Sequence, residues 1–520
     1  MLPDCLSGRC APHSLRKMMI FMLVSLLVVL AGCSGKEAAP QESSKAETEE
    51  GTSKPAPVTL SMLVNAQANW SYSKDKPIWK AITEKTNVTI NGQMPPGDNY
   101  NEALNLTIAS GEMPDLMYMF DFAVANRYGQ QGALVNILDY LDLMPNFQKW
   151  LEQYPEIKER YLSTEGEMFM FPNQGFGETE RIIWLYREDI FRKNGLEIPE
   201  SYEELYSVLK KLKQLYPDSY PFASRAGFNT LSRMAPQFDT SNGAYYDFDK
   251  DEWRYGPIEE NYKKLVVFMN TLYKEGLIAP DWLSANNKKW EDSIANDKAF
   301  VFLDYMVMDY YNSPLRKDNP EFNMLFMPPP AGFPGAPRQN LNQNVVDLGM
   351  TVASTSSKIK EAMKYMDFFY TEEGRELSSW GIKGVTYDVV DGKKKFLEQF
   401  KTLSDLREKP GLLNSGTYTW IDYDSSLSIS AKETQDAYVE ARKYDSKLQP
   451  KPAYTDKEND VINSVGLTIQ KHLEESITKF ILGDRNISEW DQYVNEMNKL
   501  GVDQILAINK EAYGRVQQLK

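Results

Sequence analysis

Beyond residue 32 the chain contains one cysteine, Cys33, and one histidine, His472, and this scarcity limits the chemistry it can perform. Zinc sites made of Cys and His, and catalysis by Cys-His or Ser-His-Asp groups, need more of these residues. Carboxylates, lysines and tyrosines remain as possible acids and bases. With 73 Asp and Glu in the chain, however, a suitable pair can always be found, so its presence is no evidence of catalysis. We expect no enzyme, no metal ligands among the site residues and no cofactor.

Cys33 follows a segment that is typical of an export signal. Two basic residues precede an apolar run over residues 18–30, and the run ends in Leu-Ala-Gly-Cys. A run of 13 residues at about 1.5 Å each is too short for the ~30 Å hydrocarbon core, so residues 1–32 are predicted to be a cleaved signal peptide. Leu-Ala-Gly-Cys resembles the bacterial lipobox, which implies that the Cys33 thiol receives a diacylglycerol and anchors the mature protein at the extracellular face of the cell membrane. Three methionines are possible starts: Met1, Met18 and Met19.

The next segment, residues 33–57, is a mixture of Glu, Ser, Lys and Pro with almost no large apolar side chain. It cannot bury enough surface to offset the entropy of ordering it, so we expect a disordered tether after the lipidated cysteine. The whole chain has a net charge of −15 and shows no basic footprint, which argues against a nucleic-acid partner. Its 520 residues are enough for roughly two to four domains or lobes.

Apolar periodicity after the tether predicts strands that alternate with helices. Strands are expected at 58–64, 88–90 and 116–120, separated by helices at 76–86 and around Tyr100–Ile108. Three such units in about 65 residues are typical of an open α/β sheet, whose ligands bind beyond the carboxyl ends of the strands. The polar loop after the first strand and the aspartate after the third strand should therefore share one edge of the sheet.

A second α/β region is predicted from about Trp184, with Ser201 as the N-cap of a helix and Glu204 three residues later. Residues 246–255 place a polar turn between two aromatic arms. The alternating aspartates there resemble an EF-hand loop, but its glycine and its bidentate glutamate are absent, so we predict a plain hairpin and leave a structural calcium open. A strand over 345–353 is expected to return the chain to the first lobe.

A family resemblance is carried by the lipobox and by five stretches in a specific order and spacing: Ala109–Leu116, Trp184–Phe191, Gly195–Pro199, Trp380–Tyr387 and Leu500–Asp503. Together they resemble the extracellular solute-binding proteins of carbohydrate ABC importers, in the large Gram-positive lipoprotein form, over nearly all of residues 58–520. The resemblance implies a periplasmic-binding-protein-like α/β fold, with two α/β lobes joined by a hinge and the ligand cleft between them. Lys383 departs from the family, which often has Glu there; a lysine either faces solvent or favours an acidic sugar.

The resemblance and the composition together divide the chain into six parts. They are the signal peptide 1–32, the tether 33–57, the first part of the N-terminal lobe 58–173, the first part of the C-terminal lobe 174–344, the return segment of the N-terminal lobe 345–400, and a mostly helical part on the C-terminal lobe 401–520.

Sugars present apolar CH faces and many hydroxyls, so their sites combine aromatic platforms with Asp, Asn and Arg side chains. The candidate platforms are Trp70, Tyr245, Tyr305, Trp380 and Trp420. The candidate polar groups are Asp121 and Asp304, each at the end of an apolar run, together with Asn173 and Arg225. Packing is the alternative role for the rings, and helix capping is the alternative for Asp121. Three other tryptophans fall on apolar helical faces and are predicted to be core: Trp79, Trp150 and Trp490.

The predicted function is that of a membrane-anchored monomer, which captures an oligosaccharide by lobe closure and delivers it to an ABC permease. Two alternatives stay open. One is the same fold with an oligopeptide as its cargo. The other is a lipoprotein hydrolase or lyase acting on polysaccharide, which needs two opposed carboxylates or a Tyr or Lys base. The sequence leaves the identity, length and charge of the sugar open.

Overall fold

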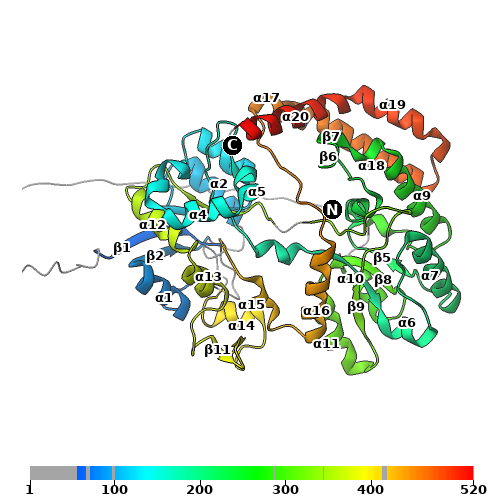
Figure 1. Ribbon diagram of the computed structural model, residues 1–520, viewed down its shortest axis with the longest axis horizontal. Coiled ribbons are helices and arrows are strands. Elements are labelled where there is room, and N and C mark those ends of the chain that lie inside the picture. Colours follow the sequence, from blue (N-terminus) through cyan, green and yellow to red (C-terminus); the bar gives the residue numbers. More distant parts are fainter. Residues whose placement is uncertain are drawn as a thin grey trace, which may run out of the picture. The chain divides into compact units, whose positions relative to one another are not determined.

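The computed structural model describes residues 56–65, 71–95, 100–284, 287–342, 345–412 and 419–518. Two four-stranded sheets and two separate hairpins are present within these residues (Figure 1). Each four-stranded sheet is the centre of one lobe.

The sheet of the first lobe consists of β1 (Val58–Leu63), β2 (Val88–Gln93), β3 (Leu116–Met119) and β10 (Gly349–Val352). Its strand order is β10-β3-β1-β2. β1 runs parallel to β2 and β3, whereas β10 is antiparallel to β3. The three strands expected in this lobe are confirmed, and β10, from the segment predicted to return to the first lobe, pairs with β3.

The sheet of the second lobe consists of β4 (Ile182–Arg187), β5 (Phe222–Ala223), β8 (Val301–Tyr305) and β9 (Met324–Met327). Its strand order is β5-β8-β4-β9, and β5 runs parallel to β8 while β4 is antiparallel to both of its neighbours. Because β5 and β8 are parallel, the residues that follow them emerge at the same edge of the sheet.

The two hairpins pair β6 (Ala244–Asp247) with β7 (Glu252–Tyr255), and β11 (Tyr387–Val390) with β12 (Lys393–Phe396). The first of them confirms the hairpin predicted over residues 246–255. Asp251 takes a positive φ of 56° in its turn, a conformation that aspartate adopts more readily than bulkier residues.

Helices cover both sheets. Those with side chains in the first core are α1 (Pro77–Thr86), α2 (Tyr100–Ser110), α3 (Phe122–Gln130), α4 (Pro145–Gln153), α5 (Pro155–Tyr161), α12 (Ile359–Phe368), α13 (Glu372–Ser379) and α14 (Leu403–Glu408). Those that pack in the second lobe are α6 (Glu188–Asn194), α7 (Tyr202–Leu215), α8 (Thr230–Met234), α9 (Glu260–Lys274), α10 (Asn287–Ala295), α11 (Met308–Asp318), α16 (Lys432–Ala441), α17 (Asp456–Val461), α18 (Leu467–Leu482), α19 (Trp490–Leu500) and α20 (Val502–Gln518). α15 (Tyr423–Leu427) lies in the chain between the two groups.

Local signals set the ends of several helices. Ser201 Oγ accepts a hydrogen bond from the backbone N–H of Glu204 at 3.2 Å, which confirms it as the N-cap of α7. Gly501, at a φ of 107°, ends α19 in the left-handed conformation that glycine adopts without strain.

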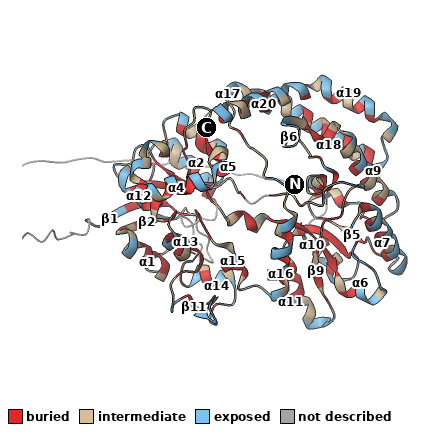
Figure 2. Ribbon diagram, in the orientation of Figure 1, coloured by how far each residue is buried: buried red, intermediate tan, exposed pale blue. Residues whose placement is uncertain are grey.

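Burial follows the two sheets, with a hydrophobic core on each (Figure 2). Trp79 and Trp150 lie in the first core and Trp490 in the second, each at most 2 % exposed, so all three are confirmed as core residues. Leu406 and Trp420 also pack in the first core. That core therefore extends beyond residue 400, where the sequence placed the end of the return segment.

Buried polar contacts tie together the segments that run between the cores. Arg181, whose side chain is 2 % exposed, donates hydrogen bonds to Glu178 at 2.8 Å and to Asp445 at 2.9 Å. The backbone N–H of Asn340 donates to the carbonyl of Tyr444 at 2.7 Å. These contacts join Arg181 and Asn340, which lie on either side of the sheet of the second lobe in the chain, to the C-terminal third of the chain.

Across the described residues, we find no helix with both the length and the apolar character that crossing a membrane requires.

Candidate functional site

The shared edge of β5 and β8 brings two arginines onto one buried carboxylate. Asp304, near the end of β8, has no exposed surface and accepts a hydrogen bond from Arg225 Nε at 2.6 Å. Arg233 Nη1, from α8, lies 3.6 Å from the other carboxylate oxygen. Each guanidinium also lies over an aromatic ring, Arg225 over Trp290 at 4.8 Å and Arg233 over Tyr305 at 5.3 Å. We refer to these five residues as the arginine cluster.

The sequence predicted Asp304 as an acceptor for sugar hydroxyls, but the structure places its carboxylate beneath the two arginines. Its Oδ1 accepts the backbone N–H of Tyr305 at 2.7 Å, and its Oδ2 accepts from Arg225. The side chains of Arg225 and Arg233 are 21 % and 13 % exposed, so both are only partly buried, and the carboxylate holds them in place. Burial lowers the pKa of Arg233, the charge of Asp304 opposes this effect, and the charge of Arg225 adds to it. Arginine nevertheless stays protonated in proteins.

In each lobe, an exposed aromatic ring lies just beyond the carboxyl end of a strand. Tyr310, five residues after β8, is 66 % exposed and packs edge-on against Tyr311 at 5.0 Å. Phe120, directly after β3, is 41 % exposed and packs edge-on against Tyr118 at 5.2 Å. Rings held in this way can stack on the CH faces of a sugar.

Two residues were predicted at the ligand-binding edge of the first lobe. Asp121 follows Phe120, is exposed, and caps α3 with its Oδ1, which accepts the backbone N–H of Ala123 at 2.8 Å. It is therefore both a helix cap and a surface carboxylate at the end of β3. Trp70 lies outside the described residues.

A cavity of about 390 Å³ lies where the β6–β7 hairpin meets residues 335–341 and 446–449. Tyr245 lines it, and its hydroxyl donates to Glu259 at 3.2 Å. Burial, and then the charge of Glu259, raise the pKa of Tyr245, so the phenol stays neutral and can donate a hydrogen bond. Ser232 and Gln449 also line the cavity, which places α8, the helix that carries Arg233, on its wall.

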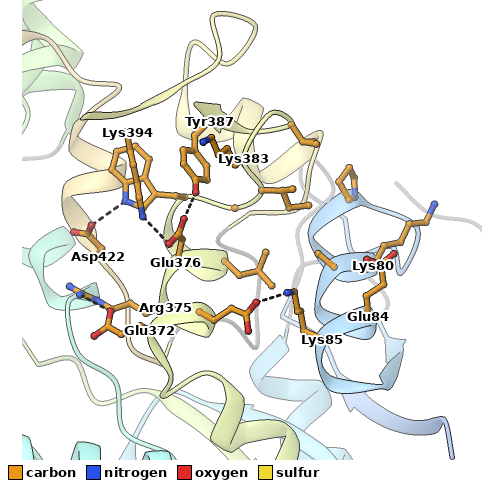
Figure 3. A pocket seen from close by; sticks show the side chains of 18 of the residues that line it. Lys80, Glu84, Lys85, Glu372, Arg375, Glu376, Lys383, Tyr387, Lys394 and Asp422 are labelled. Atoms are coloured by element: carbon orange, nitrogen blue, oxygen red, sulfur yellow. Dashed lines mark hydrogen bonds and ion pairs between the residues drawn. The ribbon is translucent and has the colours of Figure 1, made fainter. Parts of the chain in front are cut away.

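A second cavity, of about 1010 Å³, lies between α1 and α13 of the first lobe (Figure 3). Trp380 lines it at 7 % exposure and donates its indole N–H to Asp422 at 3.1 Å. Glu376 pairs with Lys394 at 3.0 Å and accepts from Tyr387, and burial followed by this bond raises the pKa of Tyr387 to about 12. Of the charged residues that line this cavity, Glu376, Glu372 and Glu373 already pair with Lys394, Arg375 and Lys85.

Two other predicted site residues pack inside the first lobe. Asn173 has no exposed surface, and its Nδ2 donates to the carbonyls of Val346 at 2.7 Å and Leu348 at 2.8 Å. Trp420 is 7 % exposed and lies beneath Arg375 at 4.8 Å. Both side chains join distant parts of the chain in this structure.

The prediction from sequence missed four residues of this arrangement: Phe120, Arg233, Trp290 and Tyr310. Position relative to a strand was a usable signal for Phe120 and Tyr310, because each follows the carboxyl end of an apolar run by a few residues. No comparable signal exists for Arg233 and Trp290, which approach the site from helices.

The chain is similar to known bacterial proteins in both sequence and fold. Residues 67–376, more than half of the chain, match the family described as bacterial extracellular solute-binding protein. Lipoprotein LipO of Bacillus subtilis (strain 168) is 24 % identical, with 94 % of this chain and 97 % of LipO covered. The fructooligosaccharide ABC transporter substrate-binding protein FusA of Streptococcus pneumoniae is 23 % identical, with 96 % of this chain and 98 % of FusA covered. The solved structure of an HMO-binding, ABC-transporter-associated solute-binding protein from Bifidobacterium longum infantis has the same fold, with a TM-score of 0.70 and 19 % identity. The match covers 89 % of this chain and 99 % of that protein.

Proposed function

The chain belongs to the family of bacterial extracellular solute-binding proteins, and on this premise we propose that it captures an oligosaccharide between its lobes and delivers it to an ABC permease. The names of FusA and of the Bifidobacterium protein support a sugar as the cargo. In this chain, the observation that carries the proposal is the pair of exposed rings, Phe120 and Tyr310, each beyond the carboxyl end of a strand in its own lobe.

Capture works by a shift between open and closed arrangements of the lobes. A sugar that touches both lobes only in the closed arrangement stabilises it by the difference in affinity. In this proposal Phe120 and Tyr310 stack on the sugar, while Asp121, Tyr245 and the arginine cluster bind its hydroxyls. Trp70, which lies outside the described residues, and Trp380, which lines the cavity between α1 and α13, remain proposed platforms.

Phe120→Ala and Tyr310→Ala should each weaken oligosaccharide binding about tenfold, because each removes a ring that stacks on the ligand. Neither should lower the melting temperature appreciably, since both rings are substantially exposed in the free protein. Isothermal titration of the lipoprotein in mild detergent, with the sugar found in the screen below, measures the effect.

Tyr220→Ala is the matched control for these two variants. Tyr220 is 38 % exposed in the second lobe but precedes β5, at the opposite edge of the same sheet. Its replacement should leave affinity unchanged. Wild-type affinity in both Phe120→Ala and Tyr310→Ala would remove these rings from the site.

The cargo class is tested by a thermal-shift screen of neutral and acidic oligosaccharides, with di- to tetrapeptides alongside. A ligand at 100 times its Kd adds about 2.7 kcal/mol to the free energy of unfolding, which such a screen detects. We expect a sugar to raise the melting temperature and to be recovered chemically unchanged. Cleavage of the sugar would identify a hydrolase or lyase, and a response to peptides alone would reassign the cargo.

We further propose that Cys33, which lies outside the described residues, carries the lipid that holds the protein at the outer face of the membrane. The lipobox and the name of the relative LipO support this assignment. Cys33→Ala should abolish incorporation of labelled palmitate and release the protein from the membrane fraction. Cys5→Ala and Cys10→Ala, upstream of the apolar run, should change neither result. Retention of the label in Cys33→Ala would contradict the assignment.

A further inference from the structure

In the arginine cluster, Arg233 is held only loosely by Asp304, at 3.6 Å, and we propose that its guanidinium binds the carboxylate of an acidic sugar, a uronic acid unit of the oligosaccharide. The inference rests on the proposed function, because it names the class of sugar that the same site takes.

Arg233 is the residue on which the charge argument depends. Among the described residues, Asp304 is the only carboxylate within 4.0 Å of its guanidinium, and the 3.6 Å separation exceeds a normal hydrogen bond. Arg233 Nη1 also donates to the carbonyl of Leu303 at 3.2 Å. Both contacts use one nitrogen of a side chain that has five N–H donors in a planar fork, a geometry that matches a carboxylate.

Partial burial strengthens this preference. The side chain of Arg233 is 13 % exposed, so its charge is less screened than that of a surface arginine. The net charge of −15 repels an anion at long range, but salt screens that repulsion within about 8–10 Å. At contact distance, the attraction of an anion to the guanidinium of Arg233 outweighs this screened repulsion.

A continuous row of rings connects the exposed platform to the cluster. Tyr310 packs on Tyr311 at 5.0 Å, and Tyr311 packs on Trp290 at 5.1 Å. The ring of Trp290 in turn lies 4.8 Å beneath the guanidinium of Arg225. The exposed ring of Tyr310 is thus joined to the cluster through two buried rings, Tyr311 and Trp290. An oligosaccharide that stacks one unit on Tyr310 can therefore present the carboxylate of another unit to the arginines.

The test compares each acidic oligosaccharide with its neutral, carboxyl-reduced analogue. Oligosaccharides of galacturonic, mannuronic, guluronic and glucuronic acid, and the carboxyl-reduced form of each, are titrated into the lipoprotein in mild detergent. We expect at least one acidic oligosaccharide to bind about tenfold or more tightly than its reduced copy. Its affinity should fall as salt rises, whereas the affinity of the reduced copy should not change.

Variants of Arg233 test whether this side chain causes the preference for the acidic sugar. Arg233→Gln should remove the preference for the acidic member of the pair, and Arg233→Lys should retain part of it. The melting temperature of each unliganded variant reports whether it is folded, and the salt dependence of the wild-type protein tests the inference without any variant.

The remaining outcomes are distinct. Equal binding of acidic and reduced sugars, or binding of neutral sugars only, would overturn this inference and leave the proposed function intact. Failure of every sugar, with or without a response to peptides, would overturn both.

Discussion

Asp304→Ala should lower the free energy of unfolding by about 3–5 kcal/mol and abolish capture of the sugar. The carboxylate has no exposed surface and holds Arg225 at 2.6 Å, with Arg233 at 3.6 Å on its other side. Without it, the two partly buried guanidiniums lose the carboxylate that lies between them. The cost of an uncompensated buried charge exceeds the net contribution of the pair, and the arginines lose the group that positions them.

Thermal melting and titration with the identified sugar measure both losses. Asp436→Ala is the matched control, because that aspartate is 61 % exposed, pairs with Lys432 within α16, and should contribute less than about 1 kcal/mol. Added acetate should restore part of the melting temperature of Asp304→Ala and leave the wild-type protein unaffected. A variant as stable as the control would show that the carboxylate does not neutralise the two guanidiniums.

Arg187→Ala should destabilise the second lobe by a similar amount, about 3–5 kcal/mol, without involving the ligand site. Arg187 ends β4, has no exposed surface, and donates to both oxygens of Asp189 at 2.8 and 2.7 Å. It also pairs with Asp297 at 2.6 Å and lies 4.1 Å from the ring of Phe322. Its removal leaves a cavity and an unpaired Asp189, which is 7 % exposed.

Urea-induced unfolding followed by circular dichroism measures this change. Arg192→Ala is the control, since Arg192 lies in the adjoining helix α6, is 60 % exposed, and pairs with Glu188 and Glu321 at the surface. It should lose less than about 1 kcal/mol. The double replacement Arg187→Met with Asp189→Leu should recover part of the loss, because it removes both charges together. A loss no larger than that of Arg192→Ala would contradict the expectation.

Much of the fold could be predicted because its signals are local. The strands at 58–64 and 116–120 were found from apolar runs, and the start of α7 from Ser201, since burial pattern and capping depend on neighbouring residues. The arrangement of the site was harder to predict from the sequence. Asp304 was correctly placed at a strand end, but its burial beneath two arginines was not foreseen, and Asn173 packs inside the first lobe.

The sequence by itself predicted an export signal with a lipobox cysteine, and it determined the alternation of strands and helices, the core tryptophans and, through its motifs, the family. Each of these follows from residues close together in the chain. Only the tertiary structure decided which side chains meet at the site. Arg225 and Asp304 are 79 residues apart, and Trp290 and Arg233 reach them from separate helices. Periodicity specifies which face of an element is buried, but sheet pairing and helix packing choose the elements that become neighbours, and so bring two cations, one carboxylate and two rings together.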